Sequence, residues 1–202
     1  MKEDLRDLEN VKDISLLLLL AENLPARVGS LFSYNSLCED LHVSQPTVKR
    51  WVDLLNLLYY SFIIHPYGPP KIKAVKKTPK LYLYDWSLVE GPGFRFENLV
   101  ACNLLKYCHF IEDTEGYAMD LRYLRDAEGR EIDFVVLKNK KPLFAVECKT
   151  GDKGLSKHIS YFHERTSIPA FYQVHLGSWD FGAAKSGRVI PYVEFCKEIL
   201  KV

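Results

Sequence analysis

The sequence lacks several features that would each have indicated a particular class of protein. It contains no GxxxxGK[ST] loop, which excludes a P-loop ATPase within this chain. The five-leucine run Leu16–Leu20 is too short to span a membrane, and we find no signal peptide before it. The five cysteines form no CxxC pair. We therefore expect a cytoplasmic protein with reduced, buried thiols and no membrane segment.

Neither sign of charge dominates the 202 residues. Lysine and arginine total 27 against 26 aspartates and glutamates, so the net charge is +1. A globally basic nucleic-acid binder is not indicated, and any nucleic-acid surface must be a local patch. The histidines show no ligand spacing with one another or with cysteine, which argues against a zinc site.

The first half of the chain predicts three helices and then two strands. An apolar helical pattern covers residues 11–24, Ser33 can cap a helix through residue 41, and Ser44 can cap the next one. Strand-like runs follow at residues 59–66 and 80–84. This order predicts a winged helix-turn-helix domain over residues 1–86.

Basic residues of this predicted domain are candidates for nucleic-acid contact. On the second helix of the pair, Lys49 and Arg50 lie off the apolar stripe and face outward. The connection between the two strands carries four lysines and no acid, which suits contact with a phosphate backbone. Equally, lysines can simply keep such a loop solvated. The predicted nucleic-acid-binding residues are Lys49, Arg50, Lys71, Lys73, Lys76 and Lys77.

Residues 87–202 predict a second domain, and the boundary region into it, residues 85–93, contains the turn Gly91-Pro92-Gly93. A helix is expected at about residues 94–107, and an apolar strand hairpin follows further along the chain. Both alternating sets of side chains in the hairpin are largely apolar, so its strands should be central with helices on both faces. The expected architecture is a three-layer α/β/α arrangement.

The hairpin carries the most informative charges. Two apolar runs, 130–137 and 144–149, flank the polar residues 138–142, which predicts a five-residue loop. If the hairpin is symmetric about its centre, Asp133 lies opposite Glu147, where like charges destabilise the ladder. A bound Mg²⁺ (with Mn²⁺ as a substitute) would explain the pair, because hard cations take carboxylate oxygens.

Glu97 on a helix, Asp133 on a strand and Glu147-Cys148-Lys149 on the next strand resemble the PD-(D/E)XK nuclease superfamily. The resemblance implies a restriction-endonuclease-like domain with a mixed central sheet. It implies that Glu97, Asp133 and Glu147 are metal ligands, and that Asp133, Glu147 and Lys149 are catalytic residues. The alternative is a salt-bridged cluster in which Lys149 neutralises Asp133 or Glu147.

Residues 12–180 also resemble a narrower family, the C-terminal part of the prokaryotic AAA-type ATPases. In that family a winged helix and a nuclease-like domain follow the ATPase module, so we expect a piece of a longer ATPase or a stand-alone descendant. The segments that carry the resemblance are Phe32–Leu37, Thr47–Lys49, Pro79–Asp85, Phe96–Val100 and Glu131–Phe134.

Three functions are compatible with these patterns. The first is a Mg²⁺-dependent DNA endonuclease or nuclease-like DNA-binding module, with DNA as partner. The second is a non-catalytic regulatory or partner-binding module of an AAA-type ATPase. The third is a transcription regulator that acts through residues 44–56. The oligomeric state is not predicted.

Overall fold

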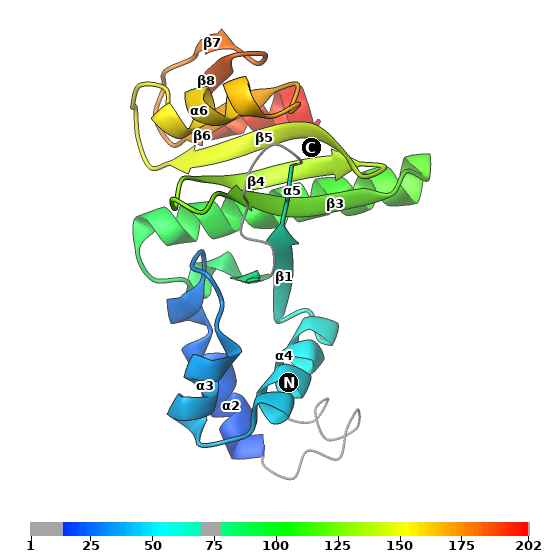
Figure 1. Cartoon of the computed structure of the whole chain (residues 1–202), viewed down its shortest axis with the longest axis vertical. Helices are drawn as coiled ribbons and strands as arrows, with labels where there is room; N and C mark the ends of the chain where they lie inside the picture. The colour runs from blue at the N-terminus through cyan, green and yellow to red at the C-terminus, as the bar shows by residue number, and fades with distance from the viewer. Residues whose placement is uncertain (1–13, 70–77, 202) are drawn as a thin grey trace.

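The computed structural model describes residues 14–69 and 78–201. In these residues the protein is α/β, with six α-helices and one eight-stranded mixed sheet in the order β2-β1-β3-β4-β5-β6-β8-β7 (Figure 1). The α-helices are α2 (Ile14–Asn23), α3 (Tyr34–Leu41), α4 (Gln45–Leu57), α5 (Pro92–Glu115), α6 (Lys157–Arg165) and α7 (Tyr192–Phe195). The strands are β1 (Ser61–Pro66), β2 (Lys80–Leu83), β3 (Met119–Arg125), β4 (Glu131–Lys138), β5 (Lys141–Lys149), β6 (Phe171–His175), β7 (Phe181–Ala183) and β8 (Gly187–Pro191).

The predicted helix caps of the first half are confirmed. The hydroxyl of Ser33 accepts the backbone N–H of Ser36 at the start of α3, and Ser44 accepts that of Thr47 at the start of α4. Such bonds satisfy donors that a helix start leaves unpaired. Between the helices, His42 adopts a left-handed conformation (φ 53°) that ends α3. The buried side of α4 is the predicted stripe of Val48, Trp51, Val52 and Leu55.

The hairpin of β4 and β5 forms, but the predicted five-residue loop is wrong. Only Asn139 and Lys140 connect the strands, and both have positive φ (50° and 65°), as a type I′ turn requires. The register shifts next to the turn, between Val136 and Leu137. Beyond the shift, Phe134 pairs with Val146, which is the register that the symmetric hairpin predicts.

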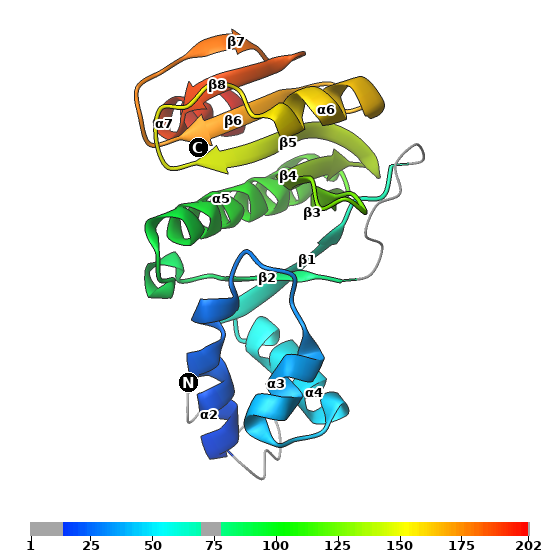
Figure 2. The ribbon, with the colours of Figure 1, turned by 60° about the vertical axis from the view of Figure 1, so that its left-hand side comes forward.

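The two halves of the chain share one sheet and one core. Strand β1 pairs antiparallel with β2 on one side and parallel with β3 on the other, through His65↔Arg122 and Pro66↔Tyr123. One continuous cluster of buried apolar side chains runs from Leu17 in α2 to Leu200 near the C-terminus. The helices α2, α3 and α4 form one end of the molecule, and β1 and β2 lead from them into the sheet (Figure 2).

Helices cover both faces of the central strands. α5 packs against one face through the larger apolar cluster, which includes Phe134 and Val146. α6 covers the other face with Ile159 and Phe162, in a second cluster. Figures 1 and 2 show the two helices on opposite sides of β4 and β5. α5 is longer than predicted, since it continues to Glu115 and ends at a left-handed Gly116 (φ 73°).

Candidate functional site

A bulge in β4 aims Asp133 at the face that α5 covers. Arg122 of β3 pairs with Val135 and Leu124 pairs with Ile132, so two residues of β4, Asp133 and Phe134, lie opposite one residue of β3. A bulge of this kind redirects a side chain that strict alternation would place on the other face. The backbone N–H of Cys148 on β5 donates to Asp133 Oδ2 at 2.7 Å. This bond ties the carboxylate to the neighbouring strand.

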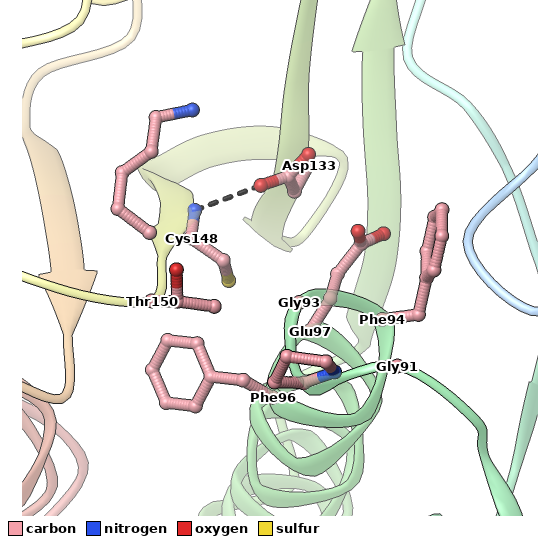
Figure 3. Close-up of a pocket in the computed structure, with 10 residues that line it drawn as sticks. Gly91, Gly93, Phe94, Phe96, Glu97, Asp133, Cys148 and Thr150 are labelled. Carbon is pink, nitrogen blue, oxygen red and sulfur yellow. Dashed lines mark hydrogen bonds between the residues drawn. The ribbon is translucent and has the colours of Figure 1, made fainter.

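Asp133 opens into a pocket of about 400 Å³ at the start of α5. Figure 3 shows the Glu97 side chain of α5 pointing toward Asp133 of β4, whose carboxylate is turned toward the backbone nitrogen of Cys148. Glu97 lies in the second turn of α5. The ten lining residues are Gly91, Pro92, Gly93, Phe94, Phe96, Glu97, Asp133, Cys148, Lys149 and Thr150. Three of the four predicted site residues, Glu97, Asp133 and Lys149, therefore share one pocket.

The fourth predicted residue, Glu147, lies outside the pocket lining and is only 3% exposed. Lys149 Nζ donates to Glu147 Oε1 at 2.6 Å, and Ser156 Oγ lies 3.5 Å from the same oxygen. The other oxygen, Oε2, is buried and has no hydrogen-bond partner among the described residues. Burial and the negative charge of Asp133 raise the pKa of Glu147 to about 8, although Lys149 opposes the shift.

The structure adds a buried lysine that the sequence reasoning missed. Lys80, the first residue of β2, is 1% exposed and forms an ion pair with Glu131. Its Nζ also lies 3.6 Å from Glu97 Oε1 and 5.5 Å from the centre of the Tyr123 ring. Side chains alternate between the two faces of a strand, so Lys80 and Tyr82 share one face while Leu81 and Leu83 share the other. This shared face is the feature of the sequence that could have indicated a role for Lys80.

Tyr82 and Glu131 complete the surroundings of Glu97 and Lys80. The Tyr82 hydroxyl donates to Glu97 Oε1 at 2.7 Å, and Glu131 Oε2 accepts from Arg125 Nη1 at 2.9 Å. Burial and the charge of Asp133 raise the pKa of Glu97 to about 7, while Lys80 and Tyr82 act in the opposite direction. The pKa of Lys80 lies above its ordinary value, since the neighbouring acids outweigh the cost of burying the charge.

Both halves of the chain match families of proteins without an assigned function. Residues 92–195, just over half of the chain, match a domain of unknown function, DUF4143. The chain belongs to this family. Residues 1–91 match a second domain of unknown function, DUF8612. No curated protein and no solved structure matches the chain.

The site draws on both matched regions. The DUF4143 region contributes Glu97, Asp133, Glu147 and Lys149, together with Glu131. Lys80 and Tyr82 come from the DUF8612 region, and so does Gly29, whose backbone approaches Glu97 closely. A Cβ at Gly29 would lie 3.2 Å from Glu97 Oε1, and its φ of +74° also favours glycine. The DUF4143 region alone therefore supplies the acids of this site and Lys149, but not the second lysine, Lys80, that neutralises them.

The donors that could hold a metal are two carboxylates rather than three. In the described parts of the chain, no three His, Cys, Asp or Glu side chains are grouped so that they could hold one ion together. Glu147 nevertheless suits a hard divalent cation, because its Oε2 is a buried acceptor without a partner among the described residues and Asp133 disfavours its negative charge. The backbone carbonyl of Cys148 is a further oxygen donor.

The structure describes only two of the six residues predicted to contact nucleic acid. Lys49 and Arg50 are exposed on α4, on the side away from its buried stripe. Lys71, Lys73, Lys76 and Lys77 lie outside the described residues, so the basic connection between β1 and β2 stays a prediction. Across residues 14–69 and 78–201, no helix is long and apolar enough to cross a membrane.

Proposed function

We propose that this protein is a Mg²⁺-dependent DNA endonuclease, or a nuclease-like DNA-binding module, that acts through Asp133, Glu147 and Lys149. The observation that carries the proposal is the buried, unpartnered Oε2 of Glu147, next to the ion pair with Lys149 and within the field of Asp133. A carboxylate in this position requires a proton or a cation. Glu97 lies on the wall of the same pocket as Asp133 and Lys149.

The arrangement of elements supports a restriction-endonuclease-like domain of the PD-(D/E)XK type. Helix α5 precedes the antiparallel strands β3, β4 and β5, and β5 then pairs in parallel with β6 through the crossover helix α6. Asp133 on β4 and the Glu147-Cys148-Lys149 triplet on β5 lie on adjacent strands, which supports this resemblance. Before them, α2, α3, α4 and the β1–β2 pair support a winged helix-turn-helix unit.

In this proposal Asp133 and Glu147 would hold the cation. A bound Mg²⁺ polarises a scissile phosphate and lowers the pKa of a coordinated water. Lys149 lines the pocket with 31% of its side chain exposed, so its ammonium can meet a phosphate oxygen while Glu147 holds its position. The pKa of Lys149 lies above its ordinary value despite burial, because Glu147 and Asp133 favour the charged form. Lys149 is therefore an electrostatic group and not a general base.

The test is nicking of supercoiled and structured DNA with Mg²⁺ or Mn²⁺, together with calorimetric titration of Mn²⁺ into the protein. We expect metal-dependent nicking that Asp133→Asn and Lys149→Ala each reduce at least 100-fold. Lys153→Ala, in the loop before α6, is the matched control for the lysine. Nicking that persists in both site variants would show that another site or a contaminant cuts the DNA.

A second function, a non-catalytic partner-binding module of an AAA-type ATPase, is favoured by one observation. The acids are already partly neutralised from within, since Lys80 and Lys149 each form an ion pair inside the cluster. Such a cluster can be purely structural. The calorimetric titration separates the two functions, because the structural cluster gives no specific heat with Mn²⁺ whereas the nuclease-like site does.

A further inference from the structure

The charges around the pocket divide into two groups, and one lysine accounts for the division. On one side, Glu147 is bonded to Lys149 and keeps one oxygen without a partner. On the other, Glu97 and Glu131 are both within ion-pair distance of Lys80. Asp133 interacts with both groups, because the positive charges of Lys80 and Lys149 each favour its ionised form.

Lys80 is held in place more firmly than a surface lysine. Its backbone bridges to Leu31, and its ammonium lies over the Tyr123 ring and is 1% exposed. A buried ammonium is tolerated only where acids surround it. A second divalent cation next to Glu97 would have to displace this ammonium or share the acids with it, at the cost of repulsion between two cations.

We propose that Lys80 is the resident cation of the site: it takes the charge of Glu97 and Glu131, so that Glu97 is not a metal ligand and the site binds one divalent cation. This inference deepens the proposed function, on which its one-metal part rests. Lys80 is a positioning residue, because it acts through the acids and does not line the pocket. The first half of the chain thereby sets the metal stoichiometry of the second.

The experiment is titration of Mn²⁺ by calorimetry at pH 7.5 into the full-length protein, Lys80→Met and Lys80→Arg. For the wild type we expect one Mn²⁺ per chain. Lys80→Met removes the charge but keeps most of the apolar volume, so it should gain a second Mn²⁺ or bind the first at least tenfold more tightly. Lys80→Arg keeps the charge and should bind as the wild type does.

Two outcomes overturn the inference. The first is a Lys80→Met variant whose stoichiometry is unchanged and whose affinity stays within threefold of the wild type. The second comes from Glu97→Gln, a variant that replaces Lys80→Met if the latter does not fold. A tenfold loss of Mn²⁺ affinity in Glu97→Gln would show that Glu97 is a metal ligand, whereas a change within threefold supports the inference. Mn²⁺ binding by both Glu97→Gln and the wild type at one ion per chain is the expected pair of results.

Failure of the proposed function is distinguishable from failure of this inference. A wild-type protein that binds no Mn²⁺ contradicts the nuclease-like proposal. In that case the Lys80→Met variant still tests the role of Lys80. A new Mn²⁺ site in this variant shows that the lysine occupies the place of a cation, whereas the absence of Mn²⁺ binding in the variant overturns the inference.

Discussion

Tyr82 on β2 donates a hydrogen bond of 2.7 Å to Glu97 on α5, so a residue of the first half orients an acid of the second. The tyrosine is fully buried, and its ring contacts Phe134 on β4 at 5.5 Å between centroids. The side chain of Asn98, the next residue of α5, bonds both backbone groups of Leu83. These bonds hold the N-terminal part of α5 against β2. The pocket at the start of α5 therefore depends on residues from both halves of the chain.

Removing the Tyr82 hydroxyl should therefore destabilise the fold. Tyr82→Phe leaves the ring contacts but deprives a buried carboxylate of its donor, which costs about 1–3 kcal/mol of the free energy of unfolding. Urea denaturation measures the loss. Tyr84→Phe is the matched control, because Tyr84 is only half-buried and its hydroxyl forms no hydrogen bond within the described residues. We expect a change below about 0.5 kcal/mol. Equal losses in the two variants would contradict the role of the Tyr82–Glu97 bond.

The stability of the metal-free protein should fall as the pH rises from about 5 to 8. Burial and Asp133 raise the pKa of Glu147 from 4.5 to about 8, so above pH 4.5 the unfolded chain releases a proton that the folded protein retains. The stabilising effect is present below pH 4.5, is lost progressively as the pH approaches 8, and the loss is complete above that value. Thermal melts in EDTA across this range check the direction.

Glu147→Gln tests the assignment of this pH dependence. Glutamine stays neutral at every pH, so the variant should gain at least about 1.4 kcal/mol over the wild type between pH 5 and pH 8, the equivalent of one pKa unit. Glu164→Gln, on the exposed side of α6, should follow the wild-type profile. A Glu147→Gln profile parallel to that of the wild type would place the titration elsewhere.

Local chemistry made much of the fold predictable. Ser33 and Ser44 cap helices by accepting from a backbone N–H three residues away. Apolar residues on both faces of β4 and β5 are enough to predict that these strands are central. The turn of the hairpin was predicted wrongly because Lys140 is an unusual residue for a left-handed position. Strand β7 carries no apolar alternation, since all three of its residues are exposed at the edge of the sheet.

The rest of the site depends on contacts that sequence patterns do not record. The bulge that redirects Asp133 arises from pairing with β3, and it is invisible in β4 alone. Lys80 is separated from Glu131 by 51 residues, and a lysine at a strand start is ordinarily a solvated residue. The buried ion pair forms only because β1 pairs with β3 and brings β2 toward the acids.

The hairpin turn offers a stabilising substitution. Lys140 has a φ of 65°, which costs free energy for a residue with a Cβ, and Asn-Gly is the preferred pair for a type I′ turn. Lys140→Gly should raise the free energy of unfolding by about 0.5 kcal/mol, after the greater freedom of glycine in the unfolded chain is subtracted. Lys140→Ala removes the same side chain but keeps the Cβ, and it should give no gain in urea denaturation. A gain in both variants would assign the effect to the loss of the lysine charge.

The exposed basic residues of α4 should contribute to the affinity for DNA if this helix contacts the phosphate backbone of the DNA. Lys49 is exposed on the side of α4 opposite its buried stripe, where an ammonium can neutralise one phosphate. Lys49→Ala should weaken binding to duplex DNA of any sequence and reduce the slope of log K against log salt by about 0.9. Fluorescence anisotropy at several salt concentrations measures both quantities. Lys197→Ala removes another exposed lysine, near the C-terminus, and should change neither. If Lys49→Ala also leaves affinity and slope unchanged, Lys49 makes no phosphate contact, and any DNA binding by the protein must use other residues.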